Sequence, residues 1–305
     1  MALVSAGRPL TRTVLALCGT AGIAGLGFLA ALHFSRVPPA SLDRQGAAPP
    51  ARIVVITTGI VDDLGAMGLL DRVVGVSARC RLPGTADKVQ IANDFGAGTV
   101  NVEAVMSLHP DLFIAEQRFR SALAASGIPG HFVPDDMSWE DLPGVIEDLG
   151  RAVQEPERAQ ALVERMESQA AGLAAAVAGL PPVRVYFEYG APGESIGSGT
   201  IVDSMIRLAG GSSISAGTSL IRPVLSNEAI VKADPEVIVL SPFTESEAEA
   251  LRRPGWSAIS AVRDGRVHKL SFEERGVMLY SWRCVDDAAR RFLPWFHPEV
   301  ADRGK

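Results

Sequence analysis

Hydrophobic and polar positions after residue 50 follow two alternating patterns. Residues 52–57 (RIVVIT) form a continuous β-branched run, which is typical of a strand buried on both faces. Residues 62–71 instead have the apolar spacing of a helix. Alternating strands and helices indicate a parallel α/β sheet. The same alternation predicts further strands at 72–77, 112–115, 131–134, 183–190, 236–241 and 265–271, and helices at 102–108, 118–126, 200–211, 227–233 and 280–296.

The middle of the chain breaks this alternation. Residues 142–180 are rich in Ala, Glu, Arg and Leu, which are strong helix formers, and the GLPP sequence at 179–182 ends the pattern. Pro156 lies where a second helix can begin, because proline is tolerated in the first helical turn. We therefore predict an α/β lobe at 52–141, a linker helix at 142–180 and a second α/β lobe at 181–299.

One combination of motifs occurs once in each predicted lobe. An acid opens a short apolar helix, and a proline then leads into a buried strand. Glu103 and Pro110 occupy these positions in the first lobe, and Glu228 and Pro235 in the second. Acids at helix N-termini are favoured by the helix dipole, so this pairing does not by itself require a partner.

The N-terminus carries a membrane-targeting signal. Arg8 and Arg12 precede an uncharged run at 13–34. This run spans roughly 33 Å as a helix, enough to cross a bilayer. Its length favours an uncleaved anchor over a cleaved signal peptide, which usually has a shorter apolar region. We assign 1–36 to the signal or anchor and 37–51 to a tether. The upstream arginines place the rest of the chain on the outer side of the cytoplasmic membrane.

Composition argues against several functions. The net charge is −6 and no polybasic run occurs, so we expect no nucleic-acid partner. The three cysteines are far apart and form no CxxC motif, although Cys80 and Cys284 can pair if the fold brings them together. GESIG at 193–197 matches GxSxG formally, but Ser198 and Gly199 separate it from the following helix. We find no catalytic constellation and expect neither enzymatic activity nor a cofactor or structural metal.

The ordered motifs resemble the substrate-binding proteins of ABC importers for iron–siderophore complexes, haem and cobalamin. The matching segments include LGAMGLLDRVVGVS, GAGTVNVEAVMSLHPDLFIA, GSGTIVDSMIRLAGGSSI and SNEAIVKADPEVIVLS, in the family's order across 52–299. The resemblance implies two parallel-sheet α/β lobes joined by a single long rigid helix. It also implies a monomeric periplasmic protein that delivers a small molecule to an ABC permease. Glu103 and Glu228 match the glutamates that contact permease arginines in this family.

In such proteins the ligand lies between the lobes, where loops at strand ends converge. Arginines in these loops bind anionic oxygens, which favours a ferric siderophore-type chelate, while aromatic residues supply apolar faces. The residues that we expect to contact the ligand are Arg79, Arg81, Phe95, Tyr189, Arg222, Tyr280, Trp282 and Arg283.

Two departures from the family affect the ligand class. Arg222 stands where the cobalamin binder has an aromatic residue, which disfavours cobalamin. No tyrosine precedes Tyr186, so the first lobe has no tyrosinate ligand for haem. The alternatives that remain are cobalamin, haem or an oxyanion as ligand, or a membrane-tethered sensor that keeps the fold without transport.

Overall fold

The computed structural model describes residues 48–272 and 274–301, so the predicted signal or anchor at 13–34 lies outside the described residues. No helix within the described ranges is long and apolar enough to cross a membrane. The first lobe is built on a parallel sheet in the order β3-β2-β1-β6-β7. Its strands are β1 (Ile53–Val55), β2 (Val73–Ser77), β3 (Val89–Ile91), β6 (Leu112–Glu116) and β7 (Gly130–Val133).

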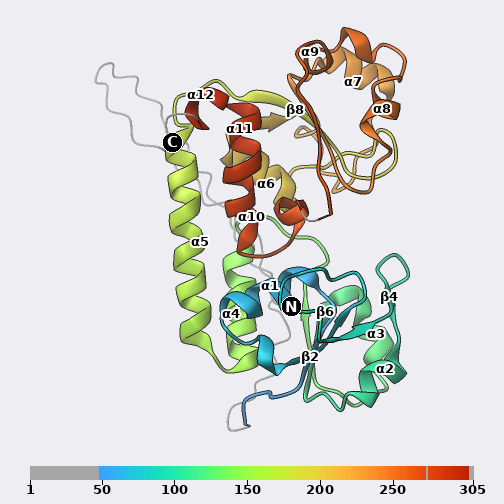
Figure 1. Cartoon of the computed structure of the whole chain (residues 1–305), viewed down its shortest axis with the longest axis vertical. Helices are drawn as coiled ribbons and strands as arrows, with labels where there is room; N and C mark the ends of the chain where they lie inside the picture. The colour runs from blue at the N-terminus through green and yellow to red at the C-terminus, as the bar shows by residue number, and fades with distance from the viewer. Residues whose placement is uncertain (1–47, 273, 302–305) are drawn as a thin grey trace, which may run out of the picture. The chain divides into compact units, whose positions relative to one another are not determined.

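Helices cover both faces of this sheet, as the continuous apolar strands require. Ile53 and Val55 of β1 join the core cluster that contains residues of α1 (Thr58–Ala66). Val54 of β1 and the next residue, Ile56, join the cluster that contains residues of α2 (Val102–Ser107) and α3 (Arg120–Leu123). Figure 1 shows α2 and α3 against the first sheet. The smaller elements are η1 (Leu70–Arg72), η2 (Gln117–Phe119) and the hairpin of β4 (Asn93–Asp94) with β5 (Thr99–Val100).

The predicted linker region contains two helices, α4 (Leu142–Val153) and α5 (Pro156–Ala176), which pack on each other (Figure 1). α4 ends at Val153 and is followed by Gln154, which has a left-handed backbone. α5 begins at Pro156, as the sequence predicts. Gly150 allows close packing here, because a Cβ atom at this position would lie 2.4 Å from the Cβ of Ala159. The long linker helix is α5, with 21 residues.

The second lobe is built on a parallel sheet in the order β11-β10-β8-β9. Its strands are β8 (Val183–Glu188), β9 (Gly211–Ser213), β10 (Val237–Leu240) and β11 (Val267–Lys269). The helices are α6 (Ile201–Leu208), α7 (Asn227–Ala233), α8 (Glu247–Ala250), η3 (Trp256–Ala258) and α9 (Ser260–Arg263). The C-terminal elements are η4 (Arg275–Met278), α10 (Arg283–Asp287), the π-helical η5 (Ala288–Phe292), α11 (Leu293–Phe296) and α12 (Pro298–Ala301).

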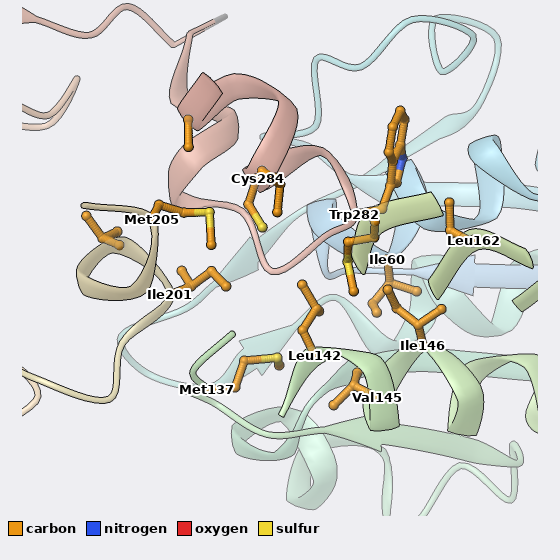
Figure 2. Close-up of a cluster of buried hydrophobic side chains, with 14 of the residues drawn as sticks. Ile60, Met137, Leu142, Val145, Ile146, Leu162, Ile201, Met205, Trp282 and Cys284 are labelled. Carbon is orange, nitrogen blue, oxygen red and sulfur yellow. The ribbon is translucent and has the colours of Figure 1, made fainter. Parts of the chain in front are cut away.

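One hydrophobic cluster extends through both lobes and the two linker helices. Ile60 of α1 belongs to the first lobe, and Met205 of α6 and Cys284 of α10 belong to the second (Figure 2). Ile146 of α4 and Leu162 of α5 belong to the same cluster and lie close to Ile60. The lobes are therefore joined by packed side chains as well as by the chain, and this shared core opposes bending between them. Cys80 and Cys284 are both buried and free.

Candidate binding site

Three aromatic side chains form a series at the carboxyl edge of the second sheet. Tyr189 follows β8, Phe243 follows β10 and Phe272 follows β11. Their ring centroids are 6.0 Å apart for Tyr189 and Phe243, and 5.4 Å apart for Phe243 and Phe272. Carboxyl ends of parallel strands lie at the same sheet edge, which is where ligands of α/β proteins bind. We call these three residues the aromatic series.

Two arginines lie over the ends of the aromatic series. The guanidinium carbon of Arg222 is 3.4 Å from the Tyr189 ring centroid, and that of Arg275 is 5.6 Å from the Phe272 centroid. Arg275 also donates to the Arg79 carbonyl of the first lobe at 3.4 Å. This edge thus combines apolar ring faces with positive charge, a combination that suits an anionic ligand with planar or apolar parts.

Phe243, Phe272 and Arg275 are absent from the ligand contacts predicted from sequence. Each phenylalanine comes three residues after the end of a strand and is half exposed, 50% in both cases. Large apolar side chains are rarely left exposed side by side in soluble proteins unless they bind something. The position just after a parallel strand is the sequence signal that identifies them.

A buried ion pair supports the loop that carries Tyr189. The Glu188 carboxylate is fully buried and accepts two hydrogen bonds from Arg253, at 2.6 and 2.7 Å. It also accepts the Tyr186 hydroxyl at 2.7 Å and the Gly193 amide at 3.0 Å. Burial and the neighbouring carboxylate of Glu188 raise the pKa of Tyr186. The network fixes the backbone of residues 189–193 next to the aromatic series.

A lysine holds the loop that carries Phe243. Lys269 Nζ donates to the Ser241 and Thr244 carbonyls at 3.0 Å, the Glu245 carbonyl at 2.9 Å and the Thr244 hydroxyl at 2.8 Å. Burial lowers the pKa of this lysine. Because four acceptors surround the ammonium group, it serves the loop and not a ligand.

The first lobe contributes Arg79 and Phe95. The Arg79 guanidinium carbon lies 5.8 Å from the Phe95 centroid, and Phe95 packs edge-on against Phe119 with centroids 5.4 Å apart. Arg79 is exposed. Arg81 donates to the carbonyls of Ala78 and Cys80 in its own loop, at 2.7 and 2.8 Å. Burial raises the pKa of Glu116, which ends β6 at the same sheet edge.

Two aspartates of α1 bind residues at the start of α10. The carboxylate of Asp62 accepts two hydrogen bonds from Arg283, at 2.6 and 2.9 Å, and Asp63 accepts the Trp282 amide at 2.9 Å. The chains approach closely here, since a Cβ atom on Gly59 would lie 2.5 Å from the Tyr280 carbonyl oxygen. We call these contacts between α1 and residues 280–283 the interlobe latch.

Asp63 makes stability depend on pH. Burial, with a smaller contribution from Asp62, raises its pKa well above the ordinary value. The folded protein thus retains a proton that the unfolded chain releases. The contribution of protonated Asp63 to stability is complete below the unfolded pKa of about 3.9 and is lost as the pH rises through the folded pKa.

Asp63→Asn keeps an acceptor for the Trp282 amide and cannot ionise. We expect it to be more stable than the parent protein at pH 8, by about 1.4 kcal/mol for each unit of pKa elevation, and to match it near pH 4.

Urea unfolding at pH 4, 6 and 8 measures this difference. Asp62→Asn is the control, because it loses the ion pair to Arg283 and should destabilise the protein at neutral pH. A stability difference for Asp63→Asn that is constant across the pH range would contradict an ionisation effect.

Tyr280 and Trp282 occupy different surroundings. The Tyr280 hydroxyl donates to Asp136 of the first lobe at 2.9 Å, and the Arg222 guanidinium lies 3.9 Å from the same oxygen. Trp282 is 9% exposed and belongs to the shared core (Figure 2). The Arg165 guanidinium of α5 lies 4.1 Å from the Trp282 ring.

The structure thus brings some of the predicted ligand contacts together. Tyr189, Arg222 and Tyr280 form one group in the second lobe, and Arg79 with Phe95 forms another in the first. Asp136 of the first lobe contacts Tyr280 and Arg222, and Arg275 of the second lobe contacts the Arg79 carbonyl. Arg283 and Trp282 contact α1 and α5, and Arg81 contacts its own loop. Within 48–272 and 274–301 no group of three or more His, Cys, Asp or Glu side chains forms a metal site.

The combination of acid, short helix, proline and strand that occurs once in each lobe also has the same structural details in both. Glu103 and Glu228 are both exposed at the second position of their helices, after the N-caps Asn101 and Ser226. Hydrogen bonding by its own amide and by Ser226 lowers the pKa of Glu228. Next to each helix end, His109 and Asp234 have a left-handed φ of 45° and precede a proline.

The same two contacts tie each helix to the start of its central strand. Arg52 donates to the Leu108 carbonyl at the end of α2, and Arg184 donates to the Asp234 carbonyl at the end of α7. The Asp111 carboxylate accepts the Arg52 amide at 3.0 Å, and that of Glu236 accepts the Arg184 amide at 3.0 Å. The two glutamates are therefore presented by equivalent, rigidly held helices.

Comparisons with known proteins agree with this architecture. The family model described as periplasmic binding protein matches residues 53–273. The chain is 30% identical over 233 residues to an ABC transporter substrate-binding lipoprotein of Bacillus subtilis described as uncharacterized, covering 72% of each chain. It is 28% identical over 204 residues to a vitamin B12-binding protein of Yersinia pestis, covering 65% of this chain and 71% of the relative.

A solved structure from Staphylococcus epidermidis has a similar fold. It is described as a possible iron-binding periplasmic solute-binding protein, and it superposes with a TM-score of 0.69 at 18% sequence identity. The match covers 81% of this chain and 99% of that one.

Proposed function

The chain belongs to the periplasmic binding protein family, and from this premise we propose that it carries an anionic metal chelate of the ferric siderophore type to an ABC permease. Proteins of this family are non-enzymatic components of transport that bind small molecules and work with an ABC permease. The single observation that carries the chelate assignment is Arg222 stacked on Tyr189 at one end of the aromatic series.

We place the ligand between the sheet edges of the two lobes. Arg222 and Arg79 supply positive charge for the donor oxygens of a chelate, and the aromatic series supplies the faces for its apolar parts. Phe95 and Tyr280 complete the proposed contact set. Arg81, Trp282 and Arg283 stay predictions as ligand contacts, and a ligand that reaches them has to displace the partners described above.

The names of the relatives are compatible with other ligands that this family binds. A relative named for vitamin B12 keeps cobalamin as the alternative, although an arginine at position 222 supports an anion. An inorganic oxyanion is supported less, because it has no use for the three rings of the aromatic series. For location we propose the outer face of the cytoplasmic membrane, with residues 13–34 as signal or anchor.

We propose further that Glu103 and Glu228 dock against basic residues of the permease. Both carboxylates are exposed, and their helices are held in equivalent ways in the two lobes. Exposed charges of this kind orient a partner and set the rate of encounter more than they add affinity. This pairing distinguishes a transport component from a tethered sensor of the same fold.

Charge reversal at both positions tests this function. We expect Glu103→Arg/Glu228→Arg to reduce uptake of the chelate by roughly ten-fold or more, since like charges facing each other across an interface cost several kcal/mol. Affinity for iron(III) tris-catecholate, measured by calorimetry on the isolated protein, should stay unchanged. The measurements are uptake of radiolabelled iron in cells and calorimetric titration.

The chain offers a matched control. Glu157 and Glu247 are also exposed acids in first helical turns, of α5 and α8, so Glu157→Arg/Glu247→Arg makes the same charge change elsewhere. Normal uptake by the Glu103/Glu228 variant, or an equal loss in the control, refutes the docking role. Absence of binding by any ferric chelate refutes the ligand class.

A further inference from the structure

The loop between β7 and α4 carries two neighbouring aspartates that face different partners. Asp135 accepts the amide and the Nε of Arg118, at 3.0 and 2.8 Å, and so serves the first lobe. Asp136 accepts the Tyr280 hydroxyl at 2.9 Å and lies 3.9 Å from an Arg222 nitrogen, both in the second lobe. A first-lobe carboxylate therefore lies beside two of the groups proposed to bind the ligand.

The contact with Arg222 is a loose one. At 3.9 Å the nitrogen and oxygen are beyond hydrogen-bond distance, so Asp136 offsets the charge of Arg222 without engaging its donors in good geometry. The Arg222 guanidinium face is occupied by the Tyr189 ring, 3.4 Å away. Its N–H edge is thus oriented and is accessible to a better acceptor.

We propose that Asp136 is an internal counter-anion, which occupies Arg222 and Tyr280 in the ligand-free protein and is displaced by an oxygen of the bound ligand. This inference rests on the proposed function for the location of the ligand. An anion that accepts the Tyr280 hydroxyl in place of Asp136 and offers two oxygens to Arg222 gains more than Asp136 loses, because a bidentate contact to Arg222 is stronger than one at 3.9 Å. A neutral ligand has no such exchange to make, so its affinity does not depend on the charge of Asp136.

The exchange also couples the ligand to the lobes. Asp136 belongs to the first lobe and its partners to the second, so displacement removes one interlobe contact and leaves the interlobe latch in place. By thermodynamic reciprocity, any change that weakens the Asp136 contact strengthens binding of an anionic ligand.

Asp136→Asn tests the proposal against Asp135→Asn. Both variants change the charge by one unit in the same loop, but only the first touches the second lobe. The first measurement needs no ligand: the rate at which phenylglyoxal modifies Arg222, followed by peptide mass spectrometry. We expect Asp136→Asn to raise this rate by roughly three-fold or more, because Arg222 is then no longer occupied by Asp136. Asp135→Asn should leave the rate unchanged. Asp136→Ser, a smaller side chain without charge, should act in the same direction.

The second measurement is calorimetric titration with iron(III) tris-catecholate, an anionic probe, and with cyanocobalamin, a corrin without that charge. We expect Asp136→Asn to bind the ferric probe roughly three- to ten-fold more tightly and Asp135→Asn to match the parent protein. Equal affinity in all three proteins overturns the counter-anion role while the proposed function stands. If the ferric probe binds none of them and the Arg222 rate still changes, the internal contact is upheld and the chelate assignment fails. An unchanged Arg222 rate overturns the proposal.

Discussion

Glu188→Ala is expected to lower the free energy of unfolding by about 3–5 kcal/mol, because it leaves the Arg253 guanidinium buried with only part of its ion pairing. Arg253 is 13% exposed and keeps Glu245 as its remaining partner. The variant also removes the acceptor for the Tyr186 hydroxyl and the Gly193 amide, and each buried donor left unpaired adds to the loss. Urea unfolding followed by circular dichroism measures the change.

Glu194→Ala is the control for this prediction. Glu194 lies in the same loop, and its side chain accepts the Ala191 amide in an exposed setting, so loss of this side chain should cost no more than about 1 kcal/mol. Equal effects of the two variants would show that the loop, and not the buried ion pair, sets the stability. We also expect Glu188→Ala to weaken ligand binding, since residues 189–193 carry Tyr189.

Arg283→Ala should lower the free energy of unfolding by about 3 kcal/mol, which is less than Glu188→Ala because the Arg283 side chain is 33% exposed. The carboxylate of Asp62, 5% exposed, loses both of its short hydrogen bonds and keeps the Ser281 hydroxyl at 3.3 Å. The double variant Asp62→Asn/Arg283→Ala should recover part of this loss, because no uncompensated charge remains.

Arg290→Ala is the matched control in the same helical stretch. Arg290 is 61% exposed and pairs with Asp286, so its removal should cost at most about 1 kcal/mol. If Arg283→Ala costs no more than Arg290→Ala in chemical unfolding, the interlobe latch contributes little to stability. If the double variant is as unstable as the sum of the single variants, the two residues do not act as a pair.

The regular part of the fold is predictable from local pattern. The run at 52–57 contains β1, and the apolar runs near 112 and 237 contain β6 and β10, because buried parallel strands need apolar residues on both faces. Pro156 marks the start of α5. The hairpin of β4 and β5 is not predictable in this way, since its strands have two residues each and no apolar pattern.

The site is only partly predictable, for a different reason. Tyr189 and Arg222 are recognisable as loop residues next to strand ends, yet their stacking depends on how two separate loops meet. The Asp62–Arg283 pair joins residues 221 apart in sequence, and no local pattern encodes such a contact. The family resemblance predicts a docking role for Glu103 and Glu228 because they lie in short ordered motifs. It says nothing of Asp136, whose partners are defined only by the folded chain.

The hydrophobic cluster shared by both lobes has a consequence for how the chain folds. Side chains of α1, α4, α5, α6 and α10 bury one another, so neither sheet with its own helices can complete its core alone. A lobe synthesised first exposes apolar surface until the later residues arrive, and such surface favours aggregation. The protein should therefore lose its structure in one cooperative transition, in which the lobes behave as a single thermodynamic unit.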